Sequence, residues 1–391
     1  MAEHEPLKTS PEDTIKPVSV PGGMVARRGQ FLQTMRQMTF EAGHFTTAEL
    51  AEAAAVPRST AQDWINRLLR EGCIFLKEEK HGRNPARYAS RSVMPSTTCR
   101  RIFTTVDGEE VEIYHECLSS GCAGFCEFHH RKAGGAALSV ARDGMLFRER
   151  SRIGITVPEP DLTNAAVGLA AVRREGNTII QTIRSVYGGP AYSLSSMMGQ
   201  AKGVCGVSIR SADGQVTGEV RTRALMHVTV GIDDTDREGC GGATFALSQA
   251  LLKYLTESGE AIGIRHQVAV LSQDIEEKTA GNSCSFLELA VEPEAVTGLA
   301  AKISRFVEEE SVSGNWGVAI ARGLHVPADL LMLAARIRRE RVTKEEVLAA
   351  AERCGIETFG GRGVIGAVAA VALRTQPQEV LLDLAYPVQD C

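Results

Sequence analysis

Three neighbouring aspartates are the first residues whose types and spacing could do chemistry. Asp233, Asp234 and Asp236 follow the apolar run Leu225–Ile232 and precede the glycine-rich segment Gly239–Gly242. Carboxylates this close repel one another unless a cation or hydrogen bonds offset the charge, and Mg²⁺ commonly combines carboxylates with phosphates. Glycines let backbone amides approach a phosphate, and the N-terminus of a following helix favours an anion. The pattern indicates a site for Mg²⁺ and a phosphorylated ligand; a turn that merely caps a helix is the alternative.

A cluster of cysteines and histidines is the second such group. Cys117, Cys122 and Cys126 fall within ten residues, and His129 follows. Thiolate and imidazole ligands at this density suit Zn²⁺ or an iron–sulfur cluster. The spacing is not that of a usual zinc finger, so buried thiols beside surface histidines are the alternative. The remaining cysteines, Cys99 among them, are isolated in the sequence and are expected to be buried or incidental.

Basic residues gather between residues 58 and 101. This segment holds ten Arg and Lys against four Asp and Glu, whereas the whole chain of 391 residues has a formal net charge of −5. A recognition helix presents residues near its N-terminus to DNA bases, and a neighbouring hairpin can contact phosphates. The predicted nucleic-acid contacts are Arg58, Thr60, Gln62, Asn66 and Arg67 on a helix, and Lys80, Arg83 and Arg87 on a hairpin. A solvated basic face that docks RNA or another protein is the alternative.

The elements that must position these basic residues have the order of a winged helix-turn-helix over residues 24–93. Apolar periodicity predicts a first helix over Val25–Ala42 that stops at Gly43. Two further helices are expected to open with capping boxes, and two short strands follow. The capping pairs are Thr46 with Glu49 and Ser59 with Gln62, and the strands are Cys73–Leu76 and Ala86–Ala89. Residues 1–23 lack periodicity and are expected to be a flexible tail.

The rest of the chain divides into three regions and a tail by its pattern. Residues 94–160 are expected to be an irregular linker that carries the cysteine cluster, and 161–224 a small β-rich middle region. Over 225–376, strands alternate with helices, which predicts an α/β or α+β module. Residues 377–391 are expected to be a C-terminal tail. The fold class is therefore multidomain, with an α-rich winged helix-turn-helix and an α/β C-terminal module.

A resemblance to a known family rests on the acidic segment and three later blocks. Residues 231–236, Gly-Ile-Asp-Asp-Thr-Asp, look like the signature of the archaeal agmatinylcytidine synthetase of isoleucine tRNA, and like that of the related methanogenesis marker protein 11 family. The later blocks that agree are Glu277–Asn282 before a strand, Ser313–Pro327, and Gly360–Ala367. The resemblance covers about 227–375 and implies an ATP- and Mg²⁺-binding, kinase-like module joined to a ferredoxin-like one.

The resemblance also implies roles for individual residues. The three aspartates would hold Mg-ATP, and Lys278 and Asn282 would contact phosphates. In the glycine-rich loop, Gly241, Gly242 and Thr244 would lie against the nucleotide; Thr244 matches the second of two adjacent threonines in the synthetase. The first, which that enzyme phosphorylates, is replaced by Ala243. The synthetase's OB-fold and zinc ribbon, which grip tRNA, have no counterpart in this sequence.

These patterns support three hypotheses about function. The first is an archaeal, cytoplasmic DNA-binding transcription regulator, able to form a homodimer, whose C-terminal module binds Mg-ATP or a related ligand. The second is an ATP-dependent enzyme that modifies RNA or a small molecule and docks its substrate through the winged helix. The third is a C-terminal module that has lost catalysis and serves as a dimerisation scaffold. Ala243 favours sensing, whereas the intact acidic segment with Lys278 favours ATP chemistry. The longest apolar run is far shorter than the roughly 20 residues of a membrane span, so no membrane partner is expected.

Overall fold

The computed structural model describes residues 23–82, 84–93, 99–186, 198–212, 214–275, 278 and 281–389. It divides the chain into two compact units, Met1–Ser96 and Thr97–Cys391. Both are built from helices and strands, so the mixed α/β, multidomain class is confirmed. The predicted flexible tail lies outside the described residues except for Gly23, as does Arg83 of the predicted hairpin.

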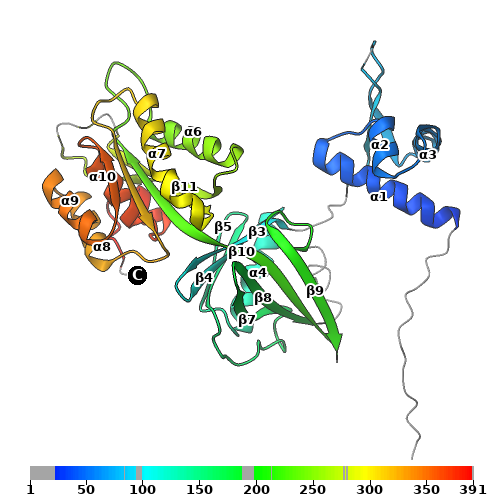
Figure 1. Ribbon diagram of the computed structural model, residues 1–391, viewed down its shortest axis with the longest axis horizontal. Helices are drawn as coiled ribbons and strands as arrows, with labels where there is room; N and C mark the ends of the chain where they lie inside the picture. Colours follow the sequence, from blue (N-terminus) through cyan, green and yellow to red (C-terminus); the bar gives the residue numbers. More distant parts are fainter. Residues whose placement is uncertain are drawn as a thin grey trace, which may run out of the picture. The chain divides into compact units, whose positions relative to one another are not determined.

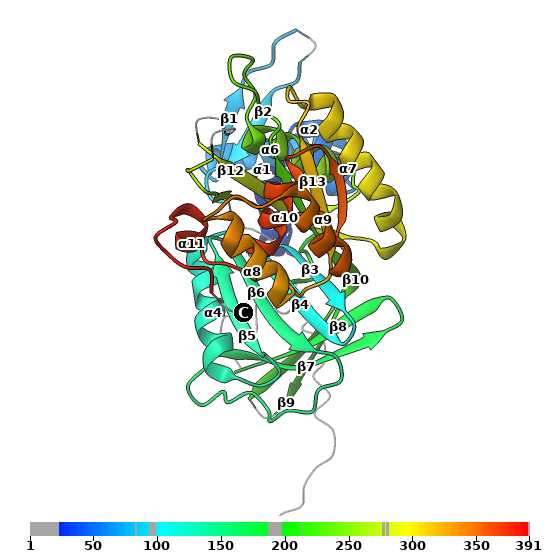
Figure 2. The ribbon, with the colours of Figure 1, turned by 90° about the vertical axis from the view of Figure 1, so that its left-hand side faces the viewer.

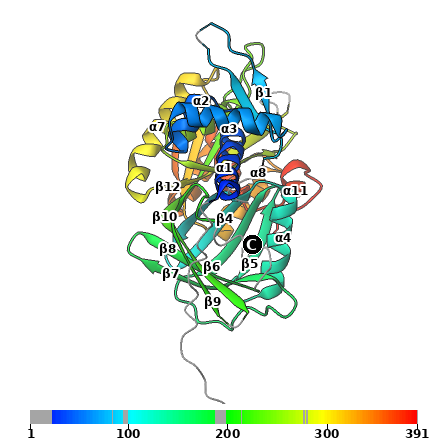
Figure 3. The same ribbon diagram turned by 90° about the vertical axis from the view of Figure 1, so that its right-hand side faces the viewer.

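Unit 1 consists of three helices followed by an antiparallel strand pair (Figures 1 and 3). Its elements are α1 (Met24–Ala42), α2 (Thr47–Ala53), α3 (Arg58–Arg70), β1 (Ile74–Glu78) and β2 (Arg87–Ser90). The core lies between the three helices, where the rings of Phe31 and Trp64 stack with centroids 5.0 Å apart. The element order therefore agrees with the predicted one.

The helix ends of unit 1 test the predicted capping signals. Gly43 ends α1 in the left-handed region at φ 73°, and Thr46 and Glu49 form the expected reciprocal capping box. The second predicted box is wrong. Helix α3 begins after Pro57 with no side-chain cap, and the Gln62 amide instead accepts a hydrogen bond from Thr47 and donates one to Asn66.

The first half of unit 2 is a strongly curved β-structure with one helix (Figure 1). It contains β3 (Cys99–Asp107), β4 (Glu110–Cys117), α4 (Ser120–Ala133), β5 (Ser139–Asp143), β6 (Leu146–Arg152), β7 (Val167–Glu175), β8 (Thr178–Val186) and β9 (Val204–Ala212). The strands β3, β4, β6 and β5 pair in that order, and β7 pairs with β8. The expectation of an irregular stretch over 94–160 is wrong. These strands bury polar residues such as Glu112 and His115, so their sequence lacks a plain apolar alternation.

The long strand β10 (Gln215–Asp233) continues from this β-structure into a second sheet. Its first part pairs with β8 and β9, it touches β3 at Ala224 and Leu225, and its last part pairs with β12 and β13. The predicted boundary between 224 and 225 thus falls inside one strand. Burial alternates along the first part and becomes almost continuous along the second, where helices cover both faces.

The second half of unit 2 is a five-stranded antiparallel sheet between two helical layers. Its elements are α6 (Thr244–Glu257), β11 (Ile262–Val270), β12 (Ser283–Val291), the 3₁₀ turn η1 (Pro293–Ala295), α7 (Val296–Glu310), β13 (Gly317–Arg322), α8 (Ala328–Ile337), α9 (Lys344–Arg353), β14 (Glu357–Gly360), α10 (Val364–Leu373) and α11 (Gln378–Leu382). The strand order is β11-β12-β10-β13-β14. Helices α6 and α7 cover one face, and α8, α9 and α10, seen from the front in Figure 2, cover the other.

The C-terminal residues pack on this sheet rather than forming a loose tail. Leu381 of α11 belongs to the core under α8 and α10, and the Arg338 guanidinium donates hydrogen bonds to the backbone oxygens of Val380 and Asp383. In the described part of the chain, no helix combines the length and apolar character needed to cross a membrane.

Candidate functional site

The acidic turn lies where β10 ends in the middle of the second sheet. Asp233 is the last residue of the strand and pairs with Gly317 of β13. Asp234 has a φ of 56°, a conformation that Asp adopts more readily than most residues, and it turns the chain away from the sheet. The Ser313 hydroxyl donates a hydrogen bond to Asp234 Oδ1 at 3.1 Å. The turn is therefore fixed by its own backbone and by the segment that precedes β13.

The first residue of α6 holds the other end of the turn. Thr235 Oγ1 donates to Thr244 Oγ1 at 3.1 Å, and Thr244 Oγ1 donates to Asp236 Oδ1 at 3.3 Å. Ser311 Oγ donates to the Thr235 carbonyl at 3.1 Å. Thr244 thus orients the acidic turn, while Ala243 before it is the N-cap of α6 and makes no side-chain cap.

Glycines bring the N-terminus of α10 directly against the end of β10. A Cβ on Gly366 would lie 1.9 Å from Asp233 Oδ2, and a Cβ on Gly363 would lie 2.6 Å from the Asp233 carbonyl oxygen. A Cβ on Gly231 would lie 1.9 Å from the carbonyl oxygen of Ala367. No other residue type fits these positions without movement. The acidic turn and the positive end of a helix therefore share one site.

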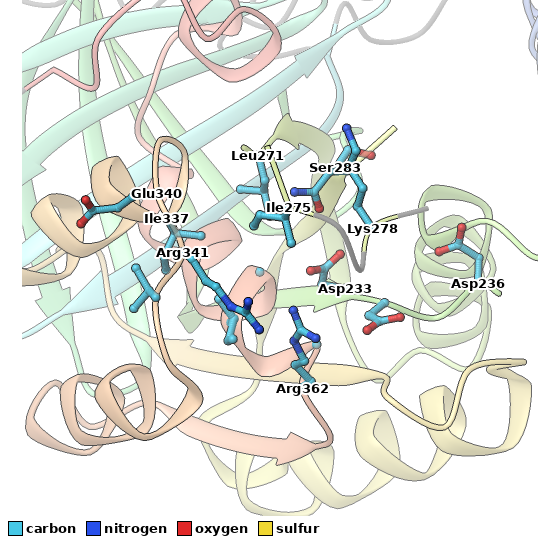
Figure 4. A pocket seen from close by; sticks show the side chains of 16 residues that line it. Asp233, Asp236, Leu271, Ile275, Lys278, Ser283, Ile337, Glu340, Arg341 and Arg362 are labelled. Carbon is cyan, nitrogen blue, oxygen red and sulfur yellow. The ribbon is translucent and has the colours of Figure 1, made fainter. Parts of the chain in front are cut away.

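A pocket opens beside this turn, with about 750 Å³ of empty space, part of it open to solvent. It is lined by all three aspartates and by Lys278 and Asn282, so the structure brings these five predicted residues together. Gly241, Gly242 and Thr244 do not line it; Thr244 acts through Asp236. In Figure 4, Asp233, Lys278, Arg341 and Arg362 surround one space although they come from separate segments.

Arg341 and Arg362 are site residues that the sequence patterns did not single out. Arg341 follows α8, and Arg362 lies in the glycine-rich loop before α10. Arg362 could have been noticed, because it stands within the block Gly360–Ala367; nothing in the sequence around Arg341 points to a ligand. With Lys278 they place three cationic side chains around the three carboxylates.

Burial and mutual repulsion make the acidic turn a poor place for unpaired negative charge. Burial raises the pKa of Asp233 well above its usual value, and the charges of Asp234 and Asp236 raise it further. Burial also raises the pKa of Asp234, although the Ser313 hydrogen bond and Arg362 oppose that shift. A bound cation relieves this repulsion. Hard carboxylate oxygens are also the ligands that Mg²⁺ takes.

Lys278 and Asn282 lie on the segment between β11 and β12. The Lys278 ammonium donates to the carbonyl oxygen of Gln273, and the Asn282 amide donates to that of Ser272. The Leu271 N–H donates to the Asn282 carbonyl at 2.9 Å. These contacts fix Lys278 and Asn282 where they line the pocket.

The predicted nucleic-acid contacts that the structure describes lie on α3, on β2 at Arg87, and between β1 and β2 at Lys80. Arg58, Asn66 and Lys80 are exposed, and Thr60 and Gln62 are half-buried. Arg67 lies 5.1 Å from the Trp64 ring centroid and pairs with Glu71 at 2.9 Å, while Arg87 pairs with Glu78 at 3.0 Å. A shallow hollow between α1 and α3 is lined by Arg27, Thr60, Trp64 and Arg67.

The predicted metal ligands are only partly brought together. Cys117, Cys122 and Cys126 are in contact, and Cys99, which the sequence left isolated, joins them. His129 is engaged elsewhere: its Nδ1 accepts a hydrogen bond from the Ala166 N–H at 3.1 Å. Within the described ranges, no three His, Cys, Asp or Glu side chains already stand in an arrangement that could hold a metal ion.

Comparison with known proteins finds relatives that each match part of the chain. The chain matches no protein-family model. It is 35% identical over 151 residues to the 2-agmatinylcytidine synthetase of isoleucine tRNA from Pyrobaculum neutrophilum, a match covering 37% of this chain and 35% of the synthetase. The two are homologous. The resemblance to that family is thus confirmed, although the chain spans only about a third of the synthetase.

Two further proteins are similar. An uncharacterized protein of Methanocaldococcus jannaschii is 27% identical over 269 residues, covering 67% of this chain and 89% of that protein. Among solved structures, a complex of the synthetase with its isoleucine tRNA and ATP is 26% identical, covers 38% of this chain and 36% of its own, and superposes with a TM-score of 0.35.

Proposed function

We propose that this protein is an ATP-dependent enzyme that modifies RNA, with chemistry of the agmatinylcytidine synthetase type. The observation that carries the proposal is the pocket, which gathers the three aspartates of the acidic turn, three cationic side chains and a helix N-terminus at the end of one strand. The homologous synthetase is named for its action on an isoleucine tRNA. This favours the enzyme hypothesis over the DNA-binding regulator, which none of the similar proteins described above supports.

In this proposal the two charge types in the pocket have separate tasks. The Asp233, Asp234 and Asp236 carboxylates hold Mg²⁺, which would neutralise the phosphates of ATP. Arg341 and Arg362 bind and orient the phosphate oxygens, as guanidinium groups can do with two parallel hydrogen bonds. Lys278 adds a point charge at the rim. The backbone amides at the start of α10 favour an anion at the same place.

The finer fold assignments belong to the same proposal. The order β10-α6-β11-β12-α7-β13, with strands arranged β11-β12-β10-β13, supports a ferredoxin-like module that β14 extends. Three helices and a strand pair support a winged helix-turn-helix in unit 1. We assign to that unit the docking of the RNA substrate, since its clustered positive charge suits phosphates whatever their sequence.

ATP binding and consumption by the full chain test the proposal. Wild-type protein should bind ATP only with Mg²⁺, and unmodified tRNA transcripts plus agmatine should stimulate ATP consumption. Asp234→Asn should weaken ATP binding on the order of tenfold, because it removes a charged ligand. Asp329→Asn, an exposed aspartate outside the pocket, is the matched control and should bind as wild type does.

The outcomes separate the hypotheses. Absence of Mg²⁺-dependent ATP binding contradicts the assignment of the pocket. ATP binding without consumption, combined with sequence-specific binding to duplex DNA, would instead favour the ligand-sensing regulator. Arg58→Ala tests the docking role: it should weaken tRNA binding and reduce its salt dependence, and unchanged affinity removes α3 from the interface.

A further inference from the structure

Four cysteine side chains meet in the first half of unit 2. Cys99 and Cys117 are partners in register at the open end of the β3–β4 pair. Cys122 and Cys126 lie four residues apart on α4, so they share one face of that helix. The Cys117 side chain interacts with those of the other three cysteines, and Cys126 also interacts with Cys122.

The cluster is closed on one side and accessible on the other. Cys99, Cys117 and Cys126 are buried, whereas Cys122 in the first turn of α4 is half-buried. Across the described residues, no disulfide joins any of the four. A thiol is a weak hydrogen-bond donor and acceptor, so contacts among thiols contribute little that apolar side chains would not. Packing alone therefore does not explain why four cysteines gather between the β3–β4 pair and α4.

Buried polar groups continue outward from the thiols. His115 Nδ1 lies 4.0 Å from Cys99 Sγ, and its Nε2 lies 3.2 Å from Gln181 Oε1. His130 Nδ1 lies 2.8 Å from Glu149 Oε1. Gln181 and Glu149 are almost completely buried, yet among the described residues Gln181 Nε2 and Glu149 Oε2 have no partner. Polar partners behind the ligands are a regular feature of metal sites.

We infer that Cys99, Cys117, Cys122 and Cys126 bind one Zn²⁺ ion as four thiolates. Zinc in structural sites is tetrahedral with Zn–S bonds of about 2.3 Å, which sets the sulfur atoms roughly 3.8 Å apart. Four neighbouring thiols can reach that spacing once their side chains turn toward a common centre, whereas a cluster of several irons holds its sulfurs further apart. The site accordingly takes a single ion.

Binding replaces thiol–thiol contacts by metal–sulfur bonds. Each thiol loses its proton to solvent as its sulfur bonds to Zn²⁺, so up to four protons leave for each ion bound. Because no three ligands among the described residues yet converge on an ion, the side chains must turn toward a common centre as they lose their protons. The N-terminus of α4, next to Cys122, favours the resulting negative charge. The ion would tie the end of the β3–β4 pair to α4.

Metal content of the purified full chain tests this inference independently of ATP chemistry. Wild type should contain one zinc per chain by elemental analysis. Cys117→Ser and Cys99→Ser should each reduce it at least tenfold. His129→Ala and Cys205→Ser, the latter an exposed thiol on β9, should retain the full amount. Loss of zinc in His129→Ala with retention in Cys99→Ser would replace the four-cysteine set by the ligands that the sequence alone suggested.

A second measurement covers variants that fail to fold. Metal-free wild-type protein titrated with Co²⁺ should develop the sulfur-to-cobalt charge-transfer band of a tetrahedral thiolate site, and Zn²⁺ should abolish the band and release protons. Protein that takes up neither ion overturns the inference. Stoichiometric iron and sulfide, or disulfides among these four residues in native protein, overturn it as well.

Discussion

The contact between Gly366 and Asp233 is the tightest packing constraint on the candidate site, and a single methyl group tests it. Gly366→Ala would put a Cβ 1.9 Å from Asp233 Oδ2 and 3.0 Å from Leu271 Cδ1, so either the carboxylate or α10 must move. Gly298→Ala on α7 is the matched control, because a Cβ there meets nothing within 4 Å. Both glycines lie in helices.

The expected difference between the two variants follows from these contacts. Alanine in place of glycine stabilises a helix by up to about 1 kcal/mol, and Gly298→Ala should retain that gain. Gly366→Ala adds the cost of overpacking a filled site, about 1–3 kcal/mol. The free energies of unfolding of the two variants should therefore differ by about 1–3 kcal/mol, with Gly366→Ala the less stable.

Urea unfolding with and without Mg²⁺ and ATP measures both consequences. A ligand that binds only the folded state stabilises it, so ATP should raise the unfolding midpoint of wild type and of Gly298→Ala. It should raise that of Gly366→Ala much less, because the Asp233 carboxylate has been displaced. Equal stability of the two variants, together with equal stabilisation by ATP, would show that this contact does not position Asp233.

Two further predictions concern buried charge. Glu288→Gln removes a fully buried carboxylate and leaves the surrounding guanidinium groups uncompensated, so it should lower the free energy of unfolding by about 3–5 kcal/mol. Glu357→Gln, which breaks an exposed pair with Arg322, is the control and should lower it by no more than about 1 kcal/mol. Urea unfolding measures both values. Burial would raise the pKa of Glu112, but Arg148 outweighs it and lowers that pKa from 4.5 to about 2. This carboxylate thus contributes roughly 3 kcal/mol above pH 4.5 that is lost as pH falls toward 2. Unfolding measured from about pH 6 to about pH 3 should show a steeper loss for wild type than for Glu112→Gln, and identical slopes would contradict the assignment.

Apolar periodicity located the elements of the second sheet well, because most of them present a wide apolar face. The alternation of strands and helices predicted over 225–376 agrees with the order of elements from β10 to α10. The domain boundary predicted between residues 224 and 225 falls inside β10 for a physical reason. One strand serves two environments, with one face covered along its first part and both along its second, so its pattern changes at residue 224 although its backbone continues.

The candidate site was predictable where its residues are neighbours in sequence. The acidic turn needs only a strand end and a following helix, both of which are local signals. Arg341 reaches the same pocket from the end of α8, and Cys99 reaches Cys117 through the pairing of β3 with β4. Contacts of this kind depend on tertiary structure. Asp107 and Gly108 lie at the turn between β3 and β4, and an Asp-Gly pair is a local signal for a hairpin. That signal could have revealed the contact between Cys99 and Cys117.

The two halves of unit 2 are joined by more than the continuous strand. Glu288 of β12 is fully buried between Arg148 of β6, which lies 3.4 Å from its Oε1, and Arg374 after α10, also at 3.4 Å. His227 of β10 completes the contact at 3.1 Å. Burial alone would raise the pKa of Glu288, but Arg148 and Arg265 hold it well below its usual value. Arg265 belongs to β11 of the same sheet as Glu288, whereas Arg148 belongs to β6, so part of this charge compensation crosses between the two halves. Loosening of the β-structure that carries the four thiols would withdraw Arg148 from the buried Glu288 carboxylate, so it is coupled to the sheet that carries Asp233. Removal of the zinc ion inferred above should therefore weaken ATP binding in the proposed site, although the two sets of residues do not overlap.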